Sequence, residues 1–158
     1  MHPTAPYCER SVGKMIIYET FKIEHYDKFR KLLDDTEGVS NREADSYDGI
    51  KRYLIRNPGF SFVAFVDNKM VGCALCGHDG RRGYLQHVMV KSEYRKKGIA
   101  KELICMCLDA LMETGIMKTH IDVFKNNDTA NNYWKKKGWI LREDINRYSY
   151  NCSKNPNI

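Results

Sequence analysis

The sequence predicts a single α/β domain of mixed α+β character, in which a mixed, mostly antiparallel, twisted sheet is covered by helices on both faces. Its 158 residues favour one domain with a sizeable core, and a hydrophobic fraction of 42% is typical of a globular chain. Strand-like and helix-like hydrophobic patterns follow one another in the order β-α-α-β-β-β-α-β-α-β. An antiparallel meander can therefore lead into a right-handed β-α-β crossover.

The first half of the chain contains two helix patterns among four strand patterns. Strand patterns occupy residues 15–23, 60–66, 70–77 and 84–90, and helix patterns occupy residues 24–35 and 46–57. In the first helix, Tyr26, Phe29, Leu32 and Leu33 fall on one apolar stripe. Ser46 is a suitable N-cap for the second helix, and the turn DNK between two strand patterns indicates a hairpin.

The second half contains two further helices and two further strands. We expect a helix at 98–115, a strand at 118–124, a helix at 128–138 and a closing strand at 139–150. Gly115 ends the longer helix, and Asp128 is placed to cap the shorter one. The predicted domain spans residues 15–151, between an N-terminal extension, 1–14, and a short tail, 152–158.

Charge is unevenly distributed along the chain. The formal net charge is +6, yet residues 34–48 contain six acidic side chains and one arginine. A basic body with one acidic segment can attract an anion at one place and a cation at another. The simpler alternative for the segment is an acidic loop surrounded by solvent.

The six cysteines form neither a metal-binding nor a disulfide pattern. Cys73 and Cys76 lie in a strand pattern, where positions three apart face opposite sides of a sheet. Cys105 and Cys107 lie in a helix pattern, where positions two apart do not meet. We therefore expect buried free thiols and no metal site.

The segment YRKKGIA, residues 94–100, joins a strand pattern to the start of a helix. A helix N-terminus offers unpaired backbone N–H groups and the positive end of the helix dipole. Gly98 lets the backbone approach a ligand closely, and Arg95, Lys96 and Lys97 add positive charge. This combination predicts a cradle for an anion such as a pyrophosphate. It matches neither a Walker loop nor a dinucleotide-binding motif, and a basic helix start on the surface is the simpler alternative.

This segment resembles motif A of the GNAT superfamily of acyl-CoA-dependent N-acetyltransferases, which reads R/Q-x-x-G-x-G/A. The matching residues are Arg95, Gly98 and Ala100. The downstream stretch NNDTANNYWKKKGW is similar to motif B of the same family, and the matching residues are Asn127, Ala130, Gly138 and Trp139. The two motifs, in this order and with a strand pattern between them, imply an acetyltransferase fold over most of the chain.

The resemblance also implies how the chain binds acetyl-CoA, its co-substrate. The pyrophosphate is expected on the backbone N–H groups of residues 95–100, and the pantetheine arm along residues 88–90, where this strand splays from the strand at 118–124. Asn127 is expected to hydrogen-bond the arm. A backbone N–H on residues 88–90 would polarise the thioester carbonyl, a kind of contact worth about 3 kcal/mol in other acyl-transfer enzymes. The implied cofactor-binding residues are Val88, Met89, Val90, Arg95, Lys96, Lys97, Gly98, Ile99, Ala100, Asn127, Ala130 and Trp134.

Acetyl transfer to an amine needs a base, because an alkyl ammonium has a pKa near ~10 and must lose a proton before it attacks. Asp122 is the leading candidate, since some relatives carry a glutamate base at this distance before the motif B asparagine. Tyr84 and His87 are rivals on the preceding strand. Strand alternation places Tyr84, but not His87, on the same face as Val88. Each of these side chains has a structural alternative, in an ion pair or a hydrogen bond.

The leaving CoA thiol has a pKa near ~8.5, so its departure gains less from an acid. The family often places a tyrosine seven positions after the motif B asparagine, and here that position is Trp134. Tyr133 comes one position earlier, about 100° around the helix. An indole N–H cannot serve as an acid near neutral pH. Tyr133 as the acid, departure without an acid, and a packing role for Trp134 all stay open.

The resemblance leaves the acceptor open. In this fold the connection between the first two helices walls the acceptor site, and here it is the acidic segment 34–48, which favours a cationic amine. Arg81 and Arg82, in the turn between the strand patterns at 70–77 and 84–90, could bind a carboxylate. Both features together would suit a zwitterion, and two solvated loops are the simpler alternative.

The sequence as a whole predicts transfer of an acetyl group from acetyl-CoA to a primary amine of an unidentified small molecule or protein. A non-catalytic acyl-CoA-binding module of the same fold and a basic nucleic-acid-binding domain are the alternatives, although no nucleic-acid motif is present. No apolar run reaches membrane-spanning length, and the N-terminus lacks the apolar core of a signal peptide. We therefore expect a cytoplasmic protein without a membrane partner, and a homodimer stays open.

Overall fold

The computed structural model describes residues 15–39 and 41–158, so the predicted extension at residues 1–14 lies outside the described residues. One sheet contains five strands in the order β1-β2-β3-β4-β5. Neighbours among the first four strands are antiparallel, and β4 and β5 are parallel. The strands are β1 (Ile17–Thr20), β2 (Phe62–Val66), β3 (Lys69–His78), β4 (Gly83–Val90) and β5 (Thr119–Ile121).

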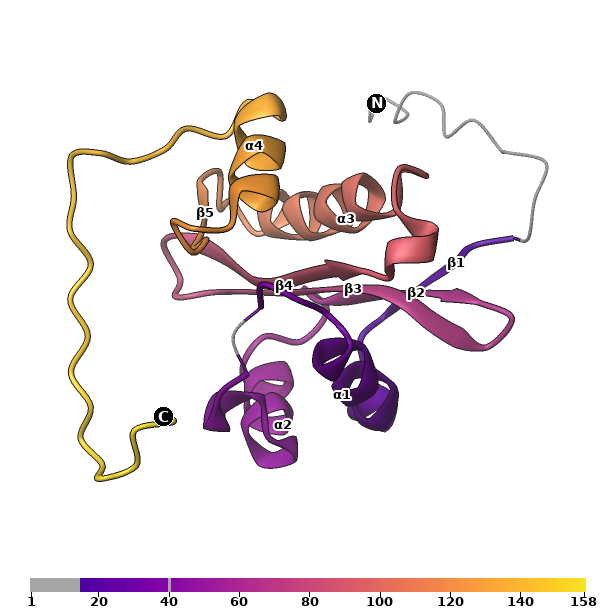
Figure 1. The fold of residues 1–158 in the computed structure, drawn as a ribbon, viewed down its shortest axis with the longest axis horizontal. Helices are drawn as coiled ribbons and strands as arrows, with labels where there is room; N and C mark the ends of the chain where they lie inside the picture. The colour runs from indigo at the N-terminus through magenta and orange to yellow at the C-terminus, as the bar shows by residue number, and fades with distance from the viewer. Residues whose placement is uncertain (1–14, 40) are drawn as a thin grey trace.

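Helices cover both faces of the sheet, as the sequence predicts (Figure 1). One face carries α1 (Tyr26–Asp34) and α2 (Tyr47–Arg56), and the other carries α3 (Ile99–Glu113) and α4 (Asp128–Lys136). Short 3-10 helices precede α1, α2 and α3, namely η1 (Ile23–His25), η2 (Glu43–Asp45) and η3 (Ser92–Tyr94). The mixed α/β prediction is confirmed, because α3 links the antiparallel part of the sheet to the parallel strand β5. None of the helices in the described residues is long and apolar enough to cross a membrane.

Each face of the sheet has its own hydrophobic cluster. The cluster beneath α1 and α2 includes Phe29, Leu32 and Met89, and the cluster beneath α3 includes Leu103 and Leu111. All five side chains are buried, and burial of one such side chain contributes about 1.5–3 kcal/mol. The two clusters hold β4 between them, which fixes the strand on which the candidate site depends.

Three cysteines contribute to these clusters as buried free thiols, which confirms the prediction for them. Cys73 faces the cluster beneath α1 and α2, and Cys76 faces the cluster beneath α3 together with Cys107. Burial raises the pKa of the Cys73 thiol, so it stays protonated. Cys105 is exposed, and the described residues contain no group of His, Cys, Asp or Glu side chains arranged to hold a metal ion.

Two helix starts show how local side chains fix the boundaries of elements. Ser46 caps α2 as predicted, because its hydroxyl accepts a hydrogen bond from the backbone N–H of Gly49 at 3.1 Å. The prediction that Asp128 caps α4 is wrong by one residue, since the Oδ1 of Asn127 accepts the backbone N–H of Ala130 at 3.1 Å. Asp128 is instead the first helical residue, where its negative charge complements the helix dipole.

The predicted strand at residues 139–150 does not form, and β5 is shorter than predicted. From Trp139 to the end of the chain the residues form no helix or strand and run as an arm beside the sheet (Figure 1). Ile140 and Tyr150 are 85% and 91% exposed. The apolar residues of this arm fall on both alternating sets of positions, so the segment has no single apolar face to bury. The predicted domain end at residue 151 therefore stays a prediction.

Candidate active site

The predicted anion cradle lies where β4 leads through η3 into α3. Gly98 is the N-cap of α3 and has φ = +80°, a left-handed conformation that strains a residue with a Cβ. A Cβ built on Gly98 would meet no described heavy atom within 4 Å, so the space beside this backbone is open. The first backbone N–H groups of α3, which have no partner within the helix, are therefore accessible to an anion.

Three consecutive cations flank this helix start. Arg95, Lys96 and Lys97 are all exposed. The Nε of Arg95 donates to the carbonyl oxygen of Val90 at 3.2 Å, and the Nζ of Lys97 lies 5.5 Å from the centre of the Tyr94 ring. These contacts hold two of the cations close to the end of β4. The loop thus combines accessible N–H groups with positive charge, which is what a phosphate site requires.

β4 extends well beyond its pairing with β5, at the place where the resemblance implies that the two strands splay apart. The two strands pair only where Gly83 to Leu85 lie beside Thr119 to Ile121, and β4 continues to Val90 without β5 at its edge. An unpaired strand edge presents backbone N–H and C=O groups that can bind an extended ligand. The predicted path of the pantetheine arm follows this stretch of β4.

The motif B residues connect α4 to its surroundings. The Oδ1 of Asn127 caps the helix, and its Nδ2 donates to the carbonyl oxygen of Gly38 at 3.4 Å, in the connection between α1 and α2. Ala130 is half-buried against the cluster beneath α3. Trp134 is 8% exposed, and its ring centre lies 4.7 Å from that of Trp139. Contact between these residues and a cofactor stays a prediction.

Of the four candidate catalytic residues, only His87 lines the pocket described below, and Asp122 and Tyr133 lie on other elements. Asp122 follows the end of β5, its side chain is 68% exposed, and its carboxylate lies 3.2 Å from the Nη2 of Arg147. Tyr133 is half-buried on α4, against the cluster beneath α3. Burial raises the pKa of the Tyr133 hydroxyl, which makes it a weaker acid.

A β-bulge in β4 changes the predicted alternation of its side chains. Leu85 and Val88 are three positions apart, but their partners on β3 are only two positions apart. One extra residue is therefore inserted in β4, and Leu85 and Val88 both pack against the cluster beneath α3.

The bulge places Tyr84 on the α2 face of the sheet. Tyr84 pairs with Gly77 of β3, and a Cβ built on Gly77 would lie 2.8 Å from the hydroxyl oxygen of Tyr53 in α2. The ring of Tyr84 lies 5.8 Å from the ring of His120. The prediction that Tyr84 shares a face with Val88 is wrong, because simple alternation assumes a strand without an inserted residue.

His87 points to the same face and contacts a buried acid there. Its Nε2 lies 2.7 Å from the Oδ1 of Asp45, and the two side chains are only 11% and 9% exposed. Asp45 ends η2, and its Oδ2 accepts the backbone N–H of Arg42 at 2.9 Å. The hydroxyl of Tyr26 donates to the backbone carbonyl of Asp45 at 2.8 Å. The acidic connection between α1 and α2 thus supplies one buried carboxylate to the sheet.

The surroundings keep Asp45 ionised. Burial alone would raise its pKa, but the hydrogen bonds from His87 and from the Arg42 N–H, with the charge of Arg30, outweigh burial and hold the pKa below its usual value. An ionised Asp45 favours the tautomer of His87 in which Nε2 carries the proton. Nδ1 is then the nitrogen that can accept a proton.

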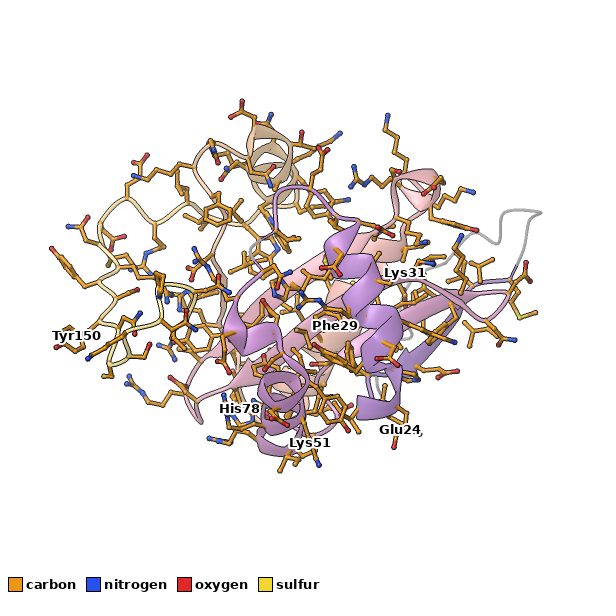
Figure 2. The ribbon with its side chains drawn as sticks, turned by 60° about the horizontal axis from the view of Figure 1, so that its bottom comes forward. Glu24, Phe29, Lys31, Lys51, His78 and Tyr150 are labelled. Atoms are coloured by element: carbon orange, nitrogen blue, oxygen red, sulfur yellow. The ribbon has the colours of Figure 1, made fainter. Side chains whose placement is uncertain are left out.

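A pocket of ≈ 550 Å³ opens beside this pair, between α2 and the middle of β4. Its lining includes Asp45, Arg52, Tyr53, Arg56, Gln86 and His87. Figure 2 shows this face of the molecule, with α1 and α2 lying over the sheet. The volume suits a small molecule or the end of a peptide.

Arg81 and Arg82, the arginines singled out in the sequence, do not line this pocket. They lie in the exposed turn between β3 and β4, where both backbone N–H groups donate to the Oδ1 of Asp79 at 2.8 Å. The guanidinium of Arg82 donates to the carbonyl oxygen of Arg81 at 3.1 Å. The positive side chains of the pocket come from α2 instead.

Sequence reasoning missed the role of Asp45, which it counted only among the acidic residues of the segment 34–48. No local pattern distinguishes Asp45, because its contact with His87 joins residues 42 positions apart. Arg52 and Arg56 did carry a usable signal. They are four positions apart in a predicted helix, a spacing that places two side chains on one side of a helix.

Comparisons with known proteins add four findings. A model of the acetyltransferase (GNAT) family matches residues 26–139. The chain is 28% identical over 108 residues to N-alpha-acetyltransferase 30 of Schizosaccharomyces pombe, covering 65% of this chain and 72% of that relative. It is 30% identical over 140 residues to N-alpha-acetyltransferase 30 of Xenopus laevis, covering 84% of this chain but 51% of that longer relative. The solved structure of aminoglycoside N-acetyltransferase AAC(6′)-Iy with CoA shares the fold, with a TM-score of 0.72 at 18% identity over 94% of this chain and 100% of that one.

Proposed function

Because the chain belongs to the acetyltransferase (GNAT) family and is an N-acetyltransferase with acetyl-CoA as its co-substrate, we propose that it acetylates a primary amine bound between α2 and β4. One observation carries this proposal. The contact between His87 and Asp45 lines an open pocket beside the stretch of β4 that β5 leaves unpaired. An amine in the pocket and a thioester along β4 can then meet at the bulge.

Acetyl-CoA is held mainly by backbone groups in this proposal. Its pyrophosphate binds the N–H groups of residues 95–100, and Arg95, Lys96 and Lys97 supply the opposite charge. The open space at Gly98 supports this placement, since phosphate oxygens can approach the helix start there. The pantetheine arm follows residues 88–90 along the unpaired edge of β4.

The reaction is a direct transfer. The amine nitrogen attacks the carbonyl carbon of the thioester, a C–N bond forms, and the C–S bond breaks as CoA leaves as a thiolate. The amine must first lose the proton that it carries as an ammonium ion. A backbone N–H group of residues 88–90 donates to the carbonyl oxygen while negative charge develops on it.

The proton acceptor is His87 rather than Asp122. His87 lines the pocket, and Asp45 fixes the orientation and the tautomer of its ring. Asp122 is exposed and paired with Arg147, and carboxylates are weak bases at neutral pH. Asp45 acts as a positioning residue, because it touches His87 and not the amine. Tyr84, on the same face of the sheet, is the second candidate.

CoA leaves without a side-chain acid. A thiol with a pKa near ~8.5 is a good leaving group near neutral pH. Tyr133 is a poor acid because burial raises its pKa, and the indole of Trp134 cannot donate a proton in this way. The Trp134 side chain supports the site by packing between α4, to which it belongs, and the rest of the domain.

The acceptor is a primary amine of a small molecule, a peptide or a protein. Two of the relatives named above are N-alpha-acetyltransferases, so α-amines are the first class to assay. Binding of acyl-CoA without turnover is the second candidate function, favoured by Trp134 at the position where the family often has a tyrosine. A cytoplasmic location and a homodimer remain predictions from the sequence.

Two parallel assays on the purified full chain test this function. Calorimetric titration measures binding of acetyl-CoA, and release of free CoA thiol is followed with a panel of α-amines and alkyl amines. We expect one-to-one binding and amine-dependent release of thiol. Binding without release for every amine would favour the binding module, and no binding at millimolar acetyl-CoA would contradict both functions.

A further inference from the structure

We propose that the acceptor carries a carboxylate close to its primary amine, and that Arg52 and Arg56 bind this carboxylate while the amine lies at His87. The inference rests on the proposed function, because it assigns the substrate class of the same pocket. An acidic peptide N-terminus and a free amino acid share the required chemistry. Experiment can distinguish these two sources.

The two arginines are arranged to bind one anion. They are four positions apart on α2, so they project from the same side of the helix, and both line the pocket. Within the described residues, no carboxylate forms an ion pair with either arginine. Even Asp48, one turn before Arg52 on α2, forms no ion pair with it. Guanidinium groups bind carboxylates through paired, charge-assisted hydrogen bonds, so two free arginines in a pocket favour such a ligand.

The acid of the pocket does not compete for these arginines. The Oδ1 of Asp45 contacts His87, and its Oδ2 accepts the backbone N–H of Arg42. Both carboxylate oxygens are therefore already engaged at the β4 side of the pocket. Arg52 and Arg56 therefore give the α2 side of the pocket an excess of positive charge, although the pocket lies against the acidic connection between α1 and α2.

The lining also contains an unpaired polar group between the two arginines in the sequence. The hydroxyl of Tyr53 is buried and has no hydrogen-bond partner among the described residues. Burial raises the pKa of Tyr53, so the hydroxyl keeps its proton. Asn57, by contrast, accepts the backbone N–H of His78 at 2.9 Å. An unpaired buried donor is uncommon in proteins. This hydroxyl lies beneath the pocket, against Gly77 of β3, so the carboxylate is assigned to the two arginines and not to Tyr53.

The test compares acceptors that differ only in the carboxylate. One set contains tetrapeptides with glutamate at the first, second or third position, each paired with its glutamine counterpart. The other set contains free amino acids, each paired with its amide. We expect kcat/KM to favour the carboxylate by about tenfold or more in one set. The set that shows the preference identifies a peptide or a free amino acid as the acceptor.

Variants of α2 link this preference to its side chains. Arg52→Gln and Arg56→Gln are expected to lower the ratio of kcat/KM between the charged and uncharged acceptors towards one. Lys51→Gln is the matched control, because Lys51 is an exposed cation on the same helix that does not line the pocket (Figure 2). It should keep the wild-type ratio. A wild-type enzyme without the preference, or a preference that both arginine variants retain, would overturn the proposal.

Failure of the proposed function would look different from failure of the anion site. If no CoA thiol is released with any acceptor, calorimetry measures how the same charged and uncharged acceptors bind to the protein saturated with CoA. Preferential binding of the carboxylates that Arg52→Gln abolishes would reject acetyl transfer and retain the anion site. Equal binding of charged and uncharged acceptors would reject the anion site.

Discussion

The two halves of the candidate site, one for the cofactor and one for the acceptor, are built in different ways. The cofactor half comes from residues 88–90 and 95–100, which are close together in the chain, and its central feature is the backbone of Gly98 at φ = +80°. The acceptor half is assembled from η2, α2 and β4, and its central contact joins His87 to Asp45 across 42 positions. Backbone N–H groups and exposed cations form the first half, and the second half centres on the buried pair of His87 and Asp45.

This difference indicates how each half responds to change. Exposed charges are screened by salt, so acetyl-CoA binding should weaken as ionic strength rises. The buried pair of His87 and Asp45 is screened much less, so the acceptor half should depend on these individual side chains. Substitutions that affect one half and spare the other therefore test the comparison.

The largest effect is expected at Gly98 in the cofactor half. Gly98→Glu adds a negative charge where we propose that the pyrophosphate binds, and it places a Cβ in a left-handed conformation. We expect the affinity for acetyl-CoA, measured by calorimetry, to fall by at least about 100-fold. An unchanged affinity would show that this cradle does not bind the pyrophosphate of acetyl-CoA.

Gly80 offers a matched control for this substitution. It has φ = +91°, a Cβ on it would meet no described heavy atom within 4 Å, and it lies in the exposed turn between β3 and β4. Gly80→Glu therefore introduces the same charge and a similar backbone strain away from the cradle. It should lower the melting temperature about as much as Gly98→Glu and leave the affinity for acetyl-CoA intact.

In the acceptor half, His87→Gln should lower kcat/KM by about 100-fold, because glutamine cannot accept a proton from the amine. His25→Gln is the control, since His25 pairs with Glu19 at 3.5 Å, outside the pocket. A wild-type kcat/KM in His87→Gln would assign the base to another residue, with Asp122 the first to test.

Asp45, in the acceptor half, also contributes to the stability of the folded protein. The pKa of the Asp45 carboxyl is lower in the folded protein than in the unfolded chain, so the unfolded chain binds more protons near pH 4. The free energy of unfolding therefore falls as pH falls through the pKa of Asp45 in the folded protein. Asp45→Asn should cost about 1–3 kcal/mol at neutral pH, and the difference from wild type should shrink below about pH 4. Urea unfolding across this range measures it. Glu37→Gln, an exposed change in the same connection, should show no such dependence.

The smallest effect is expected at Tyr133. Tyr133→Phe removes a hydroxyl whose raised pKa makes it a poor acid, so kcat should stay within about twofold of wild type. Steady-state kinetics at saturating acetyl-CoA measure this. A fall of tenfold or more would show that Tyr133 protonates the leaving thiolate.

The cofactor half could be predicted from the sequence because its determinants are local. Gly98, three cations and the helix pattern that follows lie within a few positions of one another, and the structure places them together at the start of α3. Most elements were predictable for the same reason, as the Ser46 cap of α2 shows.

The acceptor half could not be predicted, because it depends on contacts between distant segments. The bulge in β4 arises from its pairing with β3, and it sets the face on which Tyr84 lies. The contact of His87 with Asp45 exists only once η2 packs against the sheet. The predicted strand at 139–150 failed for a related reason, since its strand-like composition lacks one apolar face to pair and bury.

Single-turnover kinetics of Asp45→Asn test the separation of the two halves most directly. The rate of acetyl transfer is measured as acetyl-CoA is varied at a fixed, saturating amine concentration, so that one curve yields both the half-saturation concentration and the maximal rate. We expect the wild-type half-saturation concentration with a maximal rate lowered by about tenfold, because Asp45 contacts His87 and, in the proposed mechanism, positions its ring without touching the cofactor. A wild-type maximal rate, or a half-saturation concentration that rises as the rate falls, would contradict this account.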